Sequence, residues 1–184
     1  MTPSSPRAPA PLETVRELVN TLDVEDSVES LATPADLTTW LRRTALIGPS
    51  VRATDADLAR ALSLREALRS ALAANHDDSR VPAAAVATLR EAAERADLAL
   101  SMTADGTWIA QPRATGVDGA LGALLVVVAN AMTDGTWRRL KICLNDACQW
   151  AFYDSSRARS GKWCSMQICG NRAKQQAWRT RHEA

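Results

Sequence analysis

The sequence predicts an α+β protein: a mostly helical N-terminal domain with a small β-hairpin, followed by a C-terminal module of a second β-hairpin and a helix. Three observations lead to this class. Apolar residues recur at helical spacing through most of residues 12–136. Residues 98–110 change in character and hold two short segments on either side of Asp105-Gly106, which is typical of a hairpin. The four cysteines form two equally spaced pairs within the last quarter of the chain.

Four amphipathic helices are expected ahead of the hairpin, over residues 12–22, 34–47, 54–74 and 82–96. The second has the clearest start, because Thr33 suits the N-cap, Pro34 the first helical position and Asp36 the answering position of a capping box. Gly48-Pro49 ends this helix. Trp40 lies on its apolar face and is expected in the core.

The hairpin is expected to turn at Asp105-Gly106. Residues 118–133 are the most apolar segment of the chain and predict a buried helix, the central post of the N-terminal domain. Their uninterrupted apolar stretch is far shorter than the roughly 20 residues that span a bilayer, so no membrane partner is expected. Asp134-Gly135 marks the boundary between the N-terminal domain (12–136) and the C-terminal module (137–184).

Residues 1–11 contain four prolines and are expected to form a disordered tail. No charged start leads into an apolar run there, so no signal peptide is expected. A cytoplasmic location follows, where reducing conditions leave thiols free to bind metal. The chain is 46% apolar but only 4% aromatic, so alanine, leucine and valine must fill most of the core.

The cysteines read Cys143-Leu-Asn-Asp-Ala-Cys148, then fifteen residues, then Cys164-Ser-Met-Gln-Ile-Cys169. Each pair suits a knuckle that aims two thiolates at a common point. Four sulfur ligands without a nearby fifth fit one closed, structural Zn²⁺. Two disulfides or an iron–sulfur cluster are the alternatives, but nothing else marks a secreted chain.

Around the cysteines, strands are expected over residues 137–142 and 149–153, and a helix from Cys169 to about Arg181. Knuckle, hairpin and terminal helix together resemble a treble-clef zinc finger. Trp178 is expected to pack back onto the hairpin.

Charge divides the chain in the same way. Residues 138–184 hold ten basic and three acidic side chains, a formal charge of +7, whereas the rest of the chain carries −6. A basic module on an acidic body is typical of a nucleic-acid-binding protein. A merely solvated basic surface is the alternative.

Several short motifs resemble a known family. Trp163–Met166 followed by Cys169–Lys174, and the approach Phe152–Arg157, are similar to the CGNR zinc finger. Upstream segments resemble the ABATE domain that accompanies this finger; they are Val19–Asp23, Leu31–Leu37, Trp40-Leu41 and Leu64–Leu68. The resemblance implies a bacterial transcription regulator that binds DNA. One departure is Gly161-Lys162, where an arginine pair is more usual.

The predicted nucleic-acid contacts lie on the loop before the third cysteine and on the last helix. They are Arg157, Arg159, Lys162, Asn171, Arg172, Lys174, Gln175, Arg179 and Arg181. Loop cations would hold phosphates, while an arginine on a short helix in the major groove would read guanine and an amide would read adenine. Asn171 has an alternative role, a hydrogen bond to the backbone of the knuckle. A protein–protein adaptor and an RNA-binding module are the alternative functions.

Arg65 lies within the apolar face of the third helix, where a charge requires a partner. One hypothesis is a pocket for a small acidic effector, lined by Arg65, Asn20 and Thr21. For Asn20 and Thr21 the alternative is a capping role or a hydrogen bond to a neighbouring loop. The other is a fixed internal ion pair, with Asp23 or Asp36 as the carboxylate. A homodimer is left open. No catalytic constellation stands out, because the chain has only two histidines and no phosphate-binding glycine loop, so no enzyme activity is expected.

Overall fold

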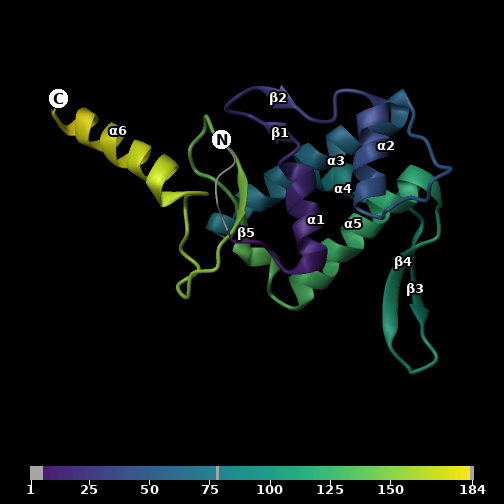
Figure 1. The fold of residues 1–184 in the computed structure, drawn as a ribbon. Helices are drawn as coiled ribbons and strands as arrows, with labels where there is room; N and C mark the ends of the chain where they lie inside the picture. Colours follow the sequence, from purple (N-terminus) through teal and green to yellow (C-terminus); the bar gives the residue numbers. More distant parts are fainter. Residues whose placement is uncertain (1–5, 78, 183–184) are drawn as a thin grey trace.

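The computed structural model describes residues 6–77 and 79–182. Within these ranges, five α-helices pack into one body and a sixth stands away from it (Figure 1). The α-helices are α1 (Ala10–Val19), α2 (Pro34–Arg43), α3 (Asp55–Ala73), α4 (Ala83–Arg95), α5 (Gly116–Thr133) and α6 (Asn171–His182). With three small hairpins beside them, the predicted α+β class is confirmed.

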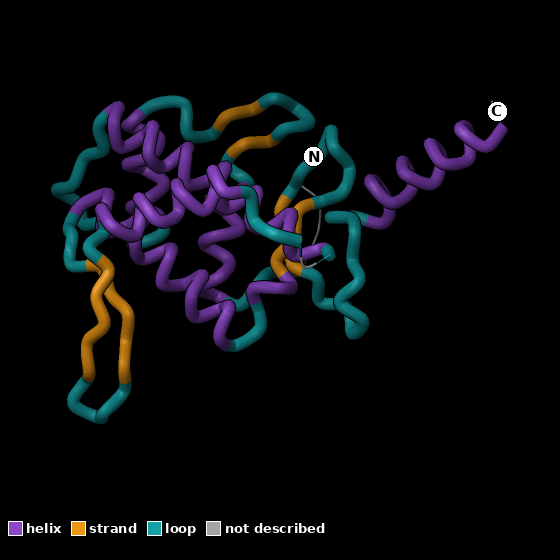
Figure 2. The backbone as a smooth tube through the Cα atoms, turned by 180° about the vertical axis from the view of Figure 1, so that it is seen from behind, coloured by secondary structure: helices purple, strands orange, loops and turns teal. Residues whose placement is uncertain are grey.

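The strands form separate two-stranded antiparallel hairpins, seen as orange segments in Figure 2. They are β1 (Leu22–Asp23) with β2 (Val28–Glu29), β3 (Leu98–Met102) with β4 (Trp108–Pro112), and β5 (Leu140–Ile142) with β6 (Ala151–Tyr153). The expected hairpin around Asp105-Gly106 is β3–β4, and Gly106 takes the left-handed φ of +82° that its turn requires. The β1–β2 hairpin was not predicted, because two residues per strand leave no alternation to detect.

Two helices begin at capping boxes. Asp36 N–H donates to the Thr33 hydroxyl at 3.2 Å, and Thr33 N–H donates back to the Asp36 carboxylate at 2.9 Å, as predicted. Thr54 and Asp57 repeat this arrangement at the start of α3. α2 ends at Arg43, ahead of the expected stop, because Ala45 turns to a φ of +57°.

α5 is the central helix of the body. By length and composition alone it could cross a membrane, as no other helix of the described ranges could. It packs against α1, α3 and α4 instead, with Leu121 and Leu124 buried. Gly122 allows this approach, since a Cβ there would lie 2.3 Å from the Cβ of Ala96 at the end of α4.

The hairpin of the C-terminal module belongs to the main hydrophobic core. Leu140, Ile142 and Ala151 are at most 5% exposed and pack in one cluster with side chains of α1, α3 and α5. The four cysteines and Phe152 form a second, smaller core beside it. The boundary expected after residue 136 therefore does not separate two independent cores.

Two expectations for the ends of the chain are wrong in the described residues. α1 begins at Ala10 and Ala8 is buried, although both lie in the tail expected to be disordered; residues 1–5 of that tail lie outside the described residues. Trp178 does not pack on the hairpin but stacks on His182 along α6, where it is 56% exposed. α6 buries none of its described side chains, because it has no apolar stripe to bury.

Candidate metal centre and nucleic-acid surface

The four cysteines meet in the small core of the finger. Their sulfur atoms all lie within 4.8 Å of one another, and all four side chains are buried. The Cys148 and Cys164 sulfurs are 3.7 Å apart, as are those of Cys164 and Cys169. A tetrahedral zinc site with Zn–S bonds of 2.3 Å requires sulfur atoms about 3.8 Å apart. The donor set and its spacing therefore fit one four-sulfur metal site, and the four thiols are free rather than bonded in disulfides.

Backbone hydrogen bonds hold the two knuckles in place. Cys143 N–H donates to the Trp150 carbonyl at 2.9 Å, which continues the β5–β6 pairing up to the first ligand. Leu144 N–H donates to the Lys162 carbonyl at 3.0 Å and ties the first knuckle to the second. The Asn145 amide points at the Cys169 sulfur from 3.7 Å. Such N–H···S contacts orient and stabilise a thiolate ligand.

The thiols affect one another's ionisation. Hydrogen bonds from Cys148 and Cys164 lower the pKa of Cys143 to about 2. The hydrogen bond with Cys143 raises the pKa of Cys148 to about 12, and the pKa of Cys164 rises for the same reason. The thiolate of Cys143 is thus favoured, and it disfavours ionisation of Cys148 and Cys164. A divalent cation is what would allow all four to ionise together, because metal binding displaces the thiol protons.

A buried ion pair organises the basic loop before the third cysteine. Lys141 Nζ lies 3.0 Å from the Asp154 carboxylate and also donates to the Arg159 carbonyl. Burial acts to raise the pKa of Asp154, but hydrogen bonds from Ser156, Lys141 and Gly161 outweigh it and lower the pKa to about 2. A Cβ on Gly161 would lie 2.8 Å from the Asp154 carboxyl carbon. A side chain at position 161 would therefore require the Asp154 carboxylate to shift.

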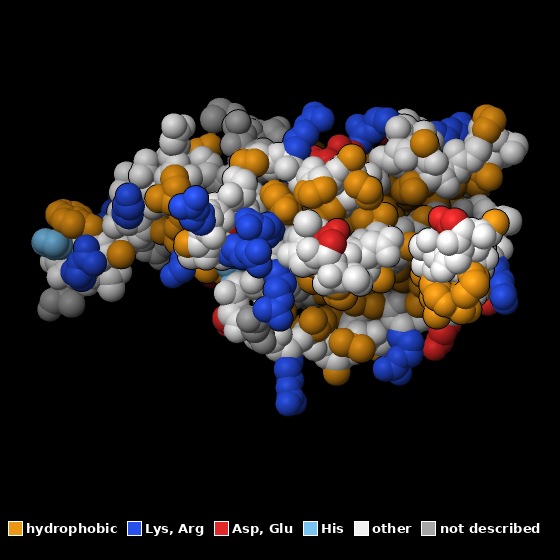
Figure 3. Space-filling view, turned by 90° about the horizontal axis from the view of Figure 1, so that it is seen from below, with side chains coloured by type: hydrophobic (Ala, Val, Ile, Leu, Met, Phe, Trp, Pro, Cys, Tyr) orange, Lys and Arg blue, Asp and Glu red, His pale blue; other side chains and the backbone are white. Residues whose placement is uncertain are grey.

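All nine predicted nucleic-acid contacts lie on the exposed surface of the finger. Arg157, Arg159 and Lys162 come from the loop that the Lys141–Asp154 pair holds, and the other six lie on α6. Figure 3 shows basic side chains spread over α6 and the neighbouring part of the body. Lys141 was counted in the formal charge of +7 for residues 138–184, but it is 2% exposed and cannot contact a nucleic acid.

Two residues at the start of α6 already have partners. Arg172 pairs with Glu25, which lies between β1 and β2, and this hydrogen bond raises the pKa of Arg172. The Asn171 amide donates to the Gln167 carbonyl at 3.0 Å, the backbone role weighed against adenine reading. Lys174 and Gln175 are exposed on the next turn.

Arg65 is enclosed by internal partners. It is 4% exposed, its Nη1 lies 2.7 Å from the Glu29 carboxylate, and its Nε lies 2.8 Å from the Glu66 carboxylate. Nη1 also donates to the Thr21 hydroxyl at 3.2 Å. The internal ion pair is thus what the structure contains, with glutamates rather than the aspartates we expected. Arg65 does not mark a ligand pocket.

Asn20 joins the helical body to the finger. Its Nδ2 donates to the Ala151 carbonyl at 2.9 Å, and its Oδ1 accepts the Ala151 N–H at 2.7 Å. The side-chain amide thereby makes the two hydrogen bonds to Ala151 that a neighbouring strand would make to β6. Arg69, one turn after Arg65, donates to the Gln149 carbonyl at 2.8 Å and to the Val19 carbonyl at 2.6 Å. We call these contacts the domain seam.

The seam extends along the end of α3. Asn75 Nδ2 lies 2.9 Å from the carbonyls of both Trp137 and Leu140, and His76 Nε2 bonds the Ile142 carbonyl. Nothing in the sequence marked Asn75 or His76 as seam residues, whereas the contact of Asn20 with Ala151 is the hydrogen bond to a neighbouring loop that was one of its two expected roles. Arg69 could have been identified, because a charged residue near the edge of the apolar face of α3 requires a polar partner.

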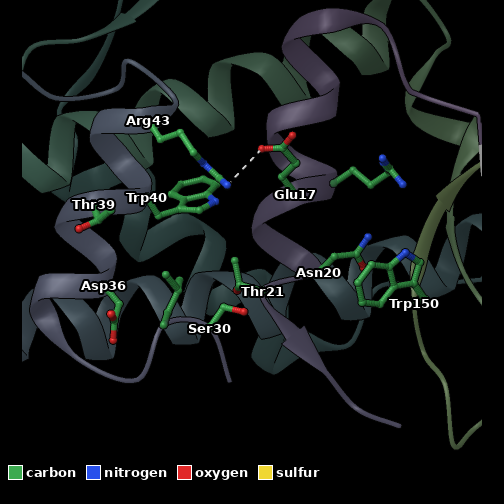
Figure 4. Close-up of a pocket in the computed structure, with 11 residues that line it drawn as sticks. Glu17, Asn20, Thr21, Ser30, Asp36, Thr39, Trp40, Arg43 and Trp150 are labelled. Carbon is green, nitrogen blue, oxygen red and sulfur yellow. Dashed lines mark ion pairs between the residues drawn. The ribbon is translucent and has the colours of Figure 1, made fainter. Parts of the chain in front are cut away.

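A cavity of about 540 Å³ opens beside the seam, between α1, α2 and the finger. It is lined by Arg16, Glu17, Asn20, Thr21, Ser30, Leu31, Asp36, Thr39, Trp40, Arg43 and Trp150. Trp40 and Trp150 lie on different sides of it, with Thr21 between them, and Arg43 pairs with Glu17 at 3.7 Å (Figure 4). Within the described residues, the buried indole nitrogens of both tryptophans have no hydrogen-bond partner. Asn20 and Thr21 therefore do line a cavity, but a different one from that expected around Arg65.

Comparison with known protein families agrees with this geometry. The model of the CGNR zinc finger matches residues 139–182, which hold the cysteine cluster and α6. The ABATE model, described as "Putative stress-induced transcription regulator", matches residues 13–135, about two thirds of the chain. A search of curated proteins finds no match. The chain therefore belongs to the ABATE family and carries a CGNR zinc finger after its ABATE domain.

Proposed function

We propose that this protein is a cytoplasmic transcription regulator that binds DNA through a zinc-stabilised finger. One observation carries the proposal: the exposed charge of the finger is almost entirely positive. Of the described acidic residues beyond position 138, Asp154 is buried in its pair with Lys141, which leaves Asp146 exposed. Seven of the nine predicted contact residues are cations on the exposed surface of the finger. Such a surface attracts the phosphate backbone and releases its counterions.

Each part of the finger has its own role in this proposal. Zinc held by the four cysteines would fix the knuckles, and no position remains for a reacting water. Arg157, Arg159 and Lys162 would hold phosphates from a loop that Asp154 keeps rigid. α6 stands clear of the body and is free to enter the major groove, where Lys174 and Gln175 would face the bases (Figure 1).

The test is fluorescence anisotropy of the full-length, zinc-loaded protein with a labelled random-sequence duplex at several salt concentrations. We expect affinity to fall steeply with salt, and Arg157→Ala to reduce the slope by about one ion. The matched control is Arg113→Ala, an exposed arginine of the helical body, which should change neither affinity nor slope. Selection of bound genomic fragments would then give the operator.

Other results would point to other functions. Stronger binding to single-stranded or structured RNA than to the duplex would favour the RNA-binding alternative. A folded, zinc-loaded protein that binds neither nucleic acid at low salt would favour the protein–protein adaptor.

We further propose that a small acidic ligand in the cavity beside the seam controls DNA binding. The volume of about 540 Å³ suits a small molecule. Arg43 pairs with Glu17 in an exposed contact at 3.7 Å, so its guanidinium is accessible to a carboxylate. Asn20 and Trp150 both line the cavity and both lie at the junction with the finger, so a ligand there would affect the contacts of the domain seam. Control requires that it bind the two states of the finger unequally.

Benzoate is a suitable first probe, because it combines a carboxylate with a ring that can stack on indole. Quenching of tryptophan fluorescence should be lost in Arg43→Gln and kept in Trp178→Phe, which removes a distant exposed indole. Equal quenching in wild type and Arg43→Gln would contradict a carboxylate site at Arg43.

A further inference from the structure

The outer part of the β3–β4 hairpin carries large apolar side chains that are more than half exposed in the part of the chain that the structure describes. In the antiparallel register, Leu100 lies opposite Ala110 and Met102 opposite Trp108. Opposite residues share a face, so these four apolar side chains lie together. The adjoining pair Leu98 and Pro112 belongs to the same face but packs beside Gly122 of α5. Leu100 is 70% exposed, Trp108 63% and Met102 57%. We call β3–β4 the arm.

The arm projects from the body rather than folding onto it (Figure 1). In the view from below, hydrophobic side chains gather at the end of the molecule opposite α6 (Figure 3). Isolated exposed apolar residues are common, but a contiguous apolar patch of several hundred Å² marks an interaction site. With its tryptophan, the arm exposes roughly 500 Å² of this kind.

A groove of about 590 Å³ with a matching surface lies elsewhere on the same chain. Val81, Val86, Leu89 and Met132 line it, and Val86 and Met132 are 40% and 55% exposed. Val81 lies just before α4, Val86 and Leu89 lie in its first two turns and Met132 lies at the end of α5, whereas the arm joins the end of α4 to the beginning of α5. Arm and groove are therefore at opposite ends of the α4–α5 pair.

The arm cannot reach its own groove. α5 has 18 residues, so the two ends of the pair are about 27 Å apart. Five residues per strand give the arm a length of only about 17 Å, and it points away from the body. A second copy placed antiparallel along α4–α5 would bring each arm to the other copy's groove.

We propose that a second copy of this chain occupies both surfaces, in a twofold dimer with each arm seated in its partner's groove. The surface area buried at the interface favours this arrangement over a direct contact between the two arms. Two arms face to face bury about 1,000 Å² in total, below the usual size of a stable interface. Reciprocal exchange buries about 2,000 Å², which is sufficient. The twofold dimer also presents two fingers, as recognition of paired half-sites requires.

The test is sedimentation equilibrium of the full-length, zinc-loaded protein, and its readout is independent of DNA. We expect a mass of twice the 19.9 kDa chain at micromolar concentration. Trp108→Lys in the arm and Met132→Glu in the groove should each raise the dimer dissociation constant by more than about tenfold. Gln111→Lys, an exposed substitution on the other face of the arm, is the matched control and should leave it unchanged.

Mixing the two variants gives the decisive result. A mixed dimer keeps one wild-type arm in one wild-type groove and pairs the new lysine with the new glutamate, so the mixture should dimerise although neither variant does alone. Circular dichroism checks that each variant is folded, and Val86→Glu replaces Met132→Glu if that chain is not. A monomeric wild type overturns the proposal. So does a dimer that resists Trp108→Lys, or one that resists both groove variants.

Discussion

Replacing Asn20 by alanine tests whether the domain seam holds the finger on the body. The side chain makes two hydrogen bonds to Ala151, at 2.7 and 2.9 Å, and Ala151 is 0% exposed. Without the amide, the N–H and the carbonyl of Ala151 lose their partners at a position that is buried in the folded protein. Each unsatisfied buried group costs about 1–3 kcal/mol. We therefore expect Asn20→Ala to lower the free energy of unfolding by about 2–5 kcal/mol.

Urea denaturation of the zinc-loaded protein, followed by tryptophan fluorescence, measures this loss. Trp150 precedes Ala151 and lines the cavity with Asn20, so one of the six tryptophans that contribute to the signal lies at the seam. The matched control is Asn130→Ala, the same chemical change at an exposed position of α5, which should shift stability by no more than about 0.5 kcal/mol. If Asn20→Ala behaves like Asn130→Ala, the amide does not pair with β6 in solution and the seam argument fails.

Three further predictions concern the finger. Cys169→Ser should abolish zinc binding, measured by elemental analysis, while far-ultraviolet circular dichroism retains most of the helical signal of α1–α5; native disulfides found by mass spectrometry would contradict this. Asp154→Asn should cost about 2–4 kcal/mol, because the carboxylate's pKa is lowered from 3.8 to about 2 and Lys141 would lose its buried partner. Because the pKa of Asp154 is lower in the folded protein than in the unfolded chain, its contribution to stability is complete above the unfolded-state pKa and is lost only as pH falls toward 2. The cost of Asp154→Asn should therefore be equal at about pH 6 and about pH 8, and a strong difference between the two would exclude this origin. Glu25→Gln should raise DNA affinity up to about fivefold by releasing Arg172, and unchanged anisotropy titrations would mean that Arg172 does not contact DNA.

The sequence by itself determined the features that depend on local chemistry. The capping box of Thr33 and Asp36 requires only residues three apart, and the turn at Gly106 requires only a residue that tolerates positive φ. The cysteine cluster was equally accessible, since two short equal spacings bring four sulfurs together in few arrangements. For the same reason the α+β class and the basic surface of the finger followed from spacing and charge.

Tertiary structure decided which partner each buried polar group found. The position of Arg65 on an apolar face indicated that it requires a carboxylate partner. That partner, Glu29, lies on a hairpin too short to predict, and only the fold places its carboxylate 2.7 Å from Arg65. Lys141 was counted as surface charge because burial by Asp154 depends on the path of the loop between them. For Asn20 the sequence indicated a ligand contact or a hydrogen bond to a neighbouring loop, but not which loop, since its partner is the backbone of Ala151 and a backbone amide has no sequence signature. Contacts between residues far apart in the chain depend on where whole elements pack, and so the single core shared by the helical body and the finger hairpin could be seen only in the folded protein.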